Sequence, residues 1–140
     1  MGSPFALCSG LAGAPLRLLD SVTEAVHHAP GAVLITGSHG GASVVPYAVA
    51  AQPRLVVFND AGVGFQQAGI AALAALQLAG IAACTVAHDS ARIGEAASTL
   101  QTGVVSHANP AAAALGAAAG RCLREWLLSG SSAESSPARH

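Results

Sequence analysis

Residues 32–60 read AVLITGSHGGASVVPYAVAAQPRLVVFND, and this stretch decides the fold. Residues 32–36 and 55–58 are short apolar runs rich in β-branched side chains, a pattern typical of strands buried on both faces. Between them, residues 42–51 are mostly apolar and predict a helix that ends before Pro53. A strand, a helix and a second strand in this order predict a βαβ unit with a right-handed crossover and parallel strands.

The same alternation continues on both sides of this unit. Further helices are predicted over residues 15–29, 66–78, 95–100 and 110–128, and further strands over residues 81–87 and 103–106. Asn109 would cap the last helix, and Pro110 would be its first residue. We therefore expect one α/β domain over residues 1–128, a three-layer sandwich of the Rossmann-like or flavodoxin-like kind. Its parallel sheet would have at least four strands, with helices on both faces. The Ser-rich residues 129–140 predict a disordered tail.

Composition excludes several classes of protein. With 52% hydrophobic and 9% charged residues, the chain is too apolar for intrinsic disorder. A net charge of −1 without a basic run gives no electrostatic reason to bind nucleic acid or an anionic membrane. Residues 69–87 are long enough to cross a bilayer, but Ala, Gly and the break at Gly80 argue against a span. Three cysteines without a CxxC pair favour reduced thiols and a cytoplasmic location.

Polar residues gather directly after the predicted strands. The segments are GSHGG at 37–41, Asn59-Asp60, HDSAR at 88–92 and SHAN at 106–109. The opposite ends of the same strands carry one charge, Arg54, and no histidine. Ligands of open parallel sheets bind outside the carboxyl ends of the strands. Loops are commonly polar, but that alone does not produce such an asymmetry, so we expect a functional site at this edge.

The expected function is acid–base chemistry by a small cofactor-independent enzyme, a lyase, isomerase or hydrolase, acting on a small anionic metabolite. The absence of a dinucleotide-binding motif argues against hydride transfer, and the absence of a P-loop argues against nucleotide hydrolysis. Histidine needs little tuning to act near neutral pH, and arginine pairs well with a carboxylate. The predicted catalytic residues are His39, His88, Asp60 and Asp89. The predicted substrate-binding residues are Ser38, Gly40, Gly41, Asn59, Ser90, Arg92 and His107.

Three alternatives use the same edge of the sheet. The protein could be a non-catalytic metabolite-binding or regulatory module. It could be a metal-dependent hydrolase, although the spacing of the ligands is not typical of a zinc or iron site. These candidate metal ligands are His39, Asp60, His88 and His107. Finally, Ser38 lies in a near match to GxSxG, and Asp89 and His107 follow in α/β-hydrolase order, although the chain is about half the usual length of such enzymes.

We also expect a homo-oligomer. The connecting helices are nearly all apolar, and the last predicted helix carries several large apolar side chains with few charges. A monomer of this size would expose large apolar patches, which self-association usually covers. The residues of the last helix concerned are Leu115, Leu123, Trp126 and Leu127.

Overall fold

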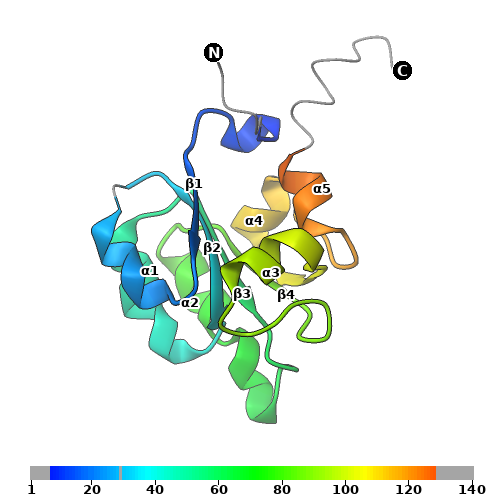
Figure 1. Ribbon diagram of the computed structural model, residues 1–140. Coiled ribbons are helices and arrows are strands. Elements are labelled where there is room, and N and C mark those ends of the chain that lie inside the picture. Colours follow the sequence, from blue (N-terminus) through cyan, green and yellow to red (C-terminus); the bar gives the residue numbers. More distant parts are fainter. Residues whose placement is uncertain (1–6, 29, 129–140) are drawn as a thin grey trace.

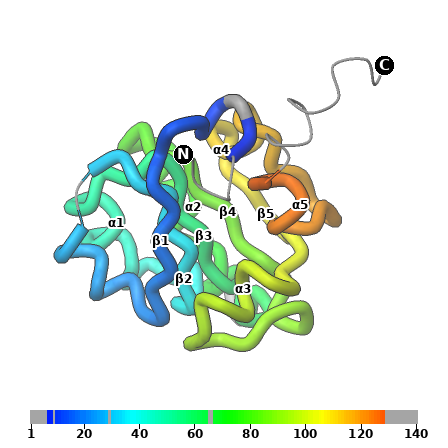
Figure 2. The backbone as a smooth tube through the Cα atoms, turned by 45° about the horizontal axis from the view of Figure 1, so that its top comes forward, coloured from blue at the N-terminus to red at the C-terminus, as the bar shows by residue number. Residues whose placement is uncertain are grey.

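The computed structural model describes residues 7–28 and 30–128 (Figure 1). The tail predicted at residues 129–140 lies outside them. Five strands form one sheet in the order β1-β2-β3-β4-β5, which is also their order along the chain (Figure 2). The strands are β1 (Leu16–Leu19), β2 (Val33–His39), β3 (Leu55–Asn59), β4 (Ala83–Val86) and β5 (Val105–Ala108).

Strands β1 to β4 are parallel to one another, and β5 is antiparallel to β4. Helices alternate with the strands, so the predicted α/β fold is confirmed as a mostly parallel mixed sheet with interleaved helices. The helical elements are η1 (Ser9–Leu11), η2 (Val22–His27), η3 (Ala42–Val44), α1 (Val45–Ala51), η4 (Phe65–Ile70), α2 (Ala72–Leu78), α3 (Ala96–Thr102), α4 (Pro110–Ala114) and α5 (Leu123–Leu127).

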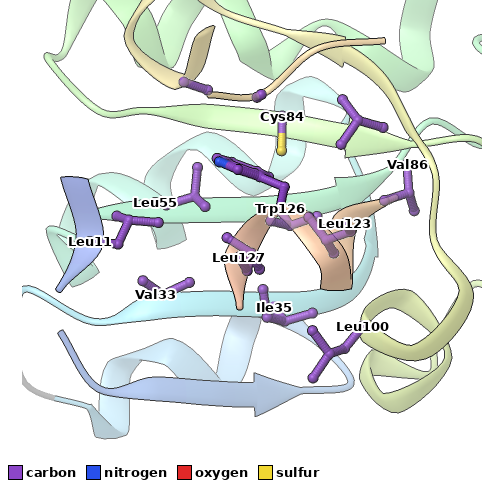
Figure 3. Packing of buried hydrophobic residues seen from close by; sticks show 14 of the residues in the cluster. Leu11, Val33, Ile35, Leu55, Cys84, Val86, Leu100, Leu123, Trp126 and Leu127 are labelled. Carbon is purple, nitrogen blue, oxygen red and sulfur yellow. The ribbon is translucent and has the colours of Figure 1, made fainter. Parts of the chain in front are cut away.

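Alternate residues of the strands contribute to two separate hydrophobic clusters. Leu34 and Phe58 belong to a cluster with buried residues of η2, α1 and α2. Val33 and Ile35 belong to the other cluster, together with residues of α3 and α5. In Figure 3, Trp126 of α5 lies in this second cluster near Leu55 and Cys84. The predicted strands 32–36 and 55–58 are buried on both faces for this reason.

The prediction of a helix over residues 15–29 is wrong. These residues form the edge strand β1 and the 3₁₀ helix η2, which Ser21 caps by accepting a hydrogen bond from Thr23 N (3.3 Å). The apolar spacing matches a helix, but short segments of this kind are ambiguous, and pairing with β2 decides the outcome. Val26, which the helical pattern would bury, is 60% exposed.

The prediction of a single helix over residues 110–128 is wrong as well. Gly116 and Gly120 adopt positive φ angles of 112° and 88° and separate α4 from α5. The start of α4 is as predicted, because Asn109 Oδ1 accepts a hydrogen bond from Ala112 N (3.0 Å) and Pro110 is the first helical residue. Among the described residues, no helix combines the length and the apolar character needed to cross a bilayer.

Candidate functional site

The carboxyl edge of the parallel strands is crossed by residues 87–95, which connect β4 to α3 and are called the crossing segment below (Figure 2). The Asn59 side-chain amide at the end of β3 donates to Ala91 O (3.0 Å). Gly94 N donates to Gly37 O in β2 (2.8 Å). The crossing segment therefore runs over the edge at which the sequence predicts a ligand site, and the hydrogen bond from Asn59 holds it there.

The glycine-rich segment 37–41, which covers the end of β2 and the turn after it, serves close packing. A Cβ atom on Gly37 would overlap the backbone of the crossing segment and would lie 2.8 Å from Asp20 O. Gly40 N donates to Asn59 O (3.0 Å), and Gly41 N donates to His39 Nδ1 (3.1 Å). Both N–H groups predicted to bind an anion therefore already have partners within the chain.

Ser38 has a structural contact of its own. Its Oγ accepts a hydrogen bond from Val22 N (2.9 Å) and so attaches η2 to β2. Within the described part of the chain, no hydrogen bond connects Ser38 with Asp89 or His107. The geometry thus provides no activated serine nucleophile.

Asp60 and His88 are brought together from the ends of β3 and β4. The Asp60 side chain is buried, and its Oδ1 accepts hydrogen bonds from Gly62 N (2.8 Å) and His88 N (3.0 Å). The same oxygen lies 3.6 Å from His88 Nδ1, while the His88 side chain is 59% exposed. A fixed carboxylate therefore lies behind an accessible imidazole.

The exposed side of His88 opens into a shallow cavity of about 480 Å³, called the α3 cavity below. It is lined by His88, Asp89, Ser90, Ala91, Arg92, Glu95, Ser98 and Thr102. Four of the predicted site residues therefore share one cavity: His88, Asp89, Ser90 and Arg92. The contribution of α3 was not predicted, although residues 95, 98 and 102 have the spacing of one helical face.

Some polar groups of the α3 cavity already have strong partners within the chain, and others do not. Ser90 Oγ donates to Ala87 O (2.7 Å) and accepts from Val104 N (2.9 Å), so this hydroxyl holds the turn. Arg92 and Glu95 form an exposed ion pair of 3.7 Å. Exposed pairs of this kind contribute little to stability, so a ligand can replace either partner.

His39 and His107 do not line the α3 cavity. The prediction that residues 106–109 lie at the same edge as the other polar segments is wrong, because β5 runs antiparallel to β4 and His107 pairs with Thr85. His107 Nδ1 is buried and has no hydrogen-bond partner among the described residues. Residues 103–106 were predicted as a further parallel strand.

The candidate metal ligands are not assembled. Within residues 7–28 and 30–128, no three His, Cys, Asp or Glu side chains lie close enough together to hold a metal ion. Comparisons with models of known families, with curated proteins and with solved structures found no match to this chain.

Proposed function

We propose that this protein is a small enzyme that performs acid–base chemistry with His88 on a small metabolite bearing a carboxylate. The observation that carries the proposal is the buried carboxylate of Asp60 next to His88 Nδ1. His88 and Arg92 line the same cavity. The reaction would be that of a lyase, isomerase or hydrolase, and it would use side chains alone.

Asp60 would act as a positioning residue. The backbone N–H groups of Gly62 and His88 hold the Asp60 carboxylate in place. The carboxylate favours the His88 tautomer with a proton on Nδ1, which leaves Nε2 free to accept or donate a proton. The carboxylate would also stabilise the imidazolium that forms when Nε2 takes a proton. The distance of 3.6 Å exceeds a hydrogen bond, but such contacts are commonly long in a free enzyme and tighten with substrate bound.

Arg92 would bind the carboxylate of the substrate. Its side chain is 80% exposed, and the guanidinium presents a planar set of donors that matches a carboxylate. Asp89 lines the same cavity and could serve as a second acid or base. His39, Gly40 and Gly41 have no part in this proposal, because they do not line the cavity.

The alternative is a non-catalytic binding or regulatory module. The observation that favours it is the open shape of the α3 cavity, since most catalytic sites exclude water more completely. A binding module would use Arg92 and His88 as hydrogen-bond donors and would need no proton transfer.

Turnover of a panel of small carboxylic acids, followed by NMR, distinguishes the two functions. We expect the wild-type protein to convert a member of the panel and His88→Asn to convert it about 10²–10⁴ times more slowly. Asparagine keeps a donor near Asp60 but cannot titrate. His27→Asn, at an exposed histidine of η2, is the matched control. Binding without turnover would favour the binding module, whereas full activity of His88→Asn would show that His88 is not the catalytic acid or base.

We also propose that the sheet lies between two layers of helices. The two hydrophobic clusters, one with η2, α1 and α2 and the other with α3 and α5, support a three-layer arrangement. A cytoplasmic location stays a prediction from the composition.

A further inference from the structure

We infer that the ligand of the α3 cavity is a zwitterion that carries an ammonium group as well as a carboxylate. This inference rests on the function proposed for the same cavity, and it adds a second charge to the substrate. The juxtaposition behind it is a single guanidinium, that of Arg92, in a cavity lining that also contains the carboxylates of Asp89 and Glu95.

The charge of the lining disfavours a ligand that is only an anion. Two carboxylates and one guanidinium give the lining a net charge of −1 when His88 is neutral. The buried Asp60 lies directly behind His88 and adds a further negative group. A simple carboxylate would gain the attraction of Arg92 but would meet the repulsion of its neighbours. An ammonium group on the same ligand turns that repulsion into attraction.

The hydrogen bonds of the cavity leave both kinds of group available. Asp89 is exposed, and the described residues include no hydrogen-bond or ion-pair partner for its carboxylate. Glu95 is 53% exposed and is held only by its 3.7 Å pair with Arg92. A ligand ammonium can take the place of Arg92 beside Glu95, and Arg92 can then turn to the ligand carboxylate. One weak surface pair is thereby replaced by two ion pairs.

Ser98 offers a further donor for the ligand carboxylate. Its Oγ accepts a hydrogen bond from Arg92 N (2.9 Å), so the hydroxyl proton remains free to donate. Ser98 and Arg92 are therefore adjacent donors, with Asp89 and Glu95 as the acceptors of the same cavity. A volume of about 480 Å³ lies within the usual range for small-molecule sites and accommodates an amino acid of a few carbons.

The test compares three ligands: norvaline, pentanoate, which is norvaline without its ammonium group, and butylamine, which is norvaline without its carboxylate. Each is titrated into the full-length protein while the backbone amide resonances of residues 88–98 are followed by NMR. We expect norvaline to bind about five- to tenfold more tightly than either single-charge ligand. In the double variant Asp89→Asn, Glu95→Gln, this preference over pentanoate should be lost. Arg92→Gln should weaken pentanoate and norvaline but not butylamine.

Glu125→Gln, at an exposed glutamate of α5, is the matched control and should leave all three affinities unchanged. Equal affinities for norvaline and pentanoate in the wild-type protein would overturn the zwitterion inference and leave the proposed acid–base function intact. If no ligand shifts these amides, the inference and the carboxylate-binding role of Arg92 both fall. Loss of the proposed catalysis is a separate outcome, measured by the turnover of His88→Asn.

Discussion

The Asp60 carboxylate has two roles, one in the turn after β3 and one beside His88. It accepts a hydrogen bond from Gly62 N, as the aspartate of a turn after a strand commonly does. The same oxygen contacts the backbone and the ring of His88. The turn contact fixes the carboxylate, and the fixed carboxylate can then orient the imidazole.

Gly37 permits the crossing segment to lie against β2. Gly37→Ala would push a Cβ atom into the backbone of residues 94 and 95, which cannot move aside as a side chain can. We expect the free energy of unfolding to fall by about 1–3 kcal/mol, measured by urea denaturation. Gly10→Ala is the control, since its Cβ would meet only the flexible end of Leu115. Equal effects of both variants would contradict the packing role of Gly37.

Cys84 gives a prediction for alkaline pH. Complete burial raises the pKa of its thiol to about 12, from an ordinary value of 9.0. Between these values the unfolded chain loses the proton and the native chain keeps it, so stability falls as pH rises above about 9, by up to about 1.4 kcal/mol per pH unit. Cys84→Ala removes this contribution. The stability advantage of the wild-type protein over the variant should therefore shrink between pH 8 and 10.5, whereas a constant difference would contradict the prediction.

Residue types alone predicted part of the candidate site. The predictions of Asp60, His88, Asp89 and Arg92 as neighbours rest on the rule that parallel strands end at one edge. The sequence could not show that the N–H groups of Gly40 and Gly41 or the hydroxyl of Ser38 have partners within the chain. The partner of Ser38 is Val22 in η2 and the partner of Gly40 is Asn59 in β3, so both depend on tertiary packing, which no local pattern specifies. The partner of Gly41 is the side chain of His39, two residues earlier.

At the scale of elements, strong local patterns predicted the structure best. Strands β2 and β3 lie where the apolar runs 32–36 and 55–58 predicted them. β2 continues three residues beyond the predicted end, through His39, so Gly37 and Ser38 belong to the strand and not to a turn. The edge strands were harder to predict. β1 has four residues in a helix-like pattern, and β5 runs antiparallel to β4, a direction that its own residues do not indicate.

Asn109 connects three elements and gives a prediction at this scale. Its side chain accepts hydrogen bonds from Ala83 N (3.1 Å) and Ala112 N (3.0 Å) and donates to Leu73 O (3.2 Å) and Ile81 O (2.9 Å). Asn109→Ala leaves these buried groups unpaired, so we expect a loss of about 3 kcal/mol or more in the free energy of unfolding.

Gln77→Ala is the control for this prediction, because Gln77 is only half-buried and makes a single contact across the same region, with Ala111 N (2.8 Å). Its effect should be about 1 kcal/mol. A thermal or urea denaturation that ranks the two variants in the opposite order would show that Asn109 is not the main connection.

At the scale of the whole molecule, the apolar surface still predicts a homo-oligomer, but on different residues. Leu123, Trp126 and Leu127 are buried within the chain and cannot form an interface. The exposed large apolar side chains are Leu18, Val26, Tyr47, Leu78 and Ile93. Leu78, at 91% exposure, is the most exposed of them. Light scattering at micromolar concentration should give a mass above 13.7 kDa, and Leu78→Glu should lower it if α2 forms the interface. A wild-type monomer would contradict the prediction.

The central claim is that Asp60 and His88 act as one catalytic unit, and a kinetic double-mutant cycle tests it most directly. The turnover of the best carboxylate substrate is measured for wild type, His88→Asn, Asp60→Asn and the double variant, with melting temperatures to verify folding. If Asp60 acts through His88, the double variant should be no slower than His88→Asn alone, and KM should change little. Independent losses that multiply in the double variant, or an active His88→Asn, would contradict the account.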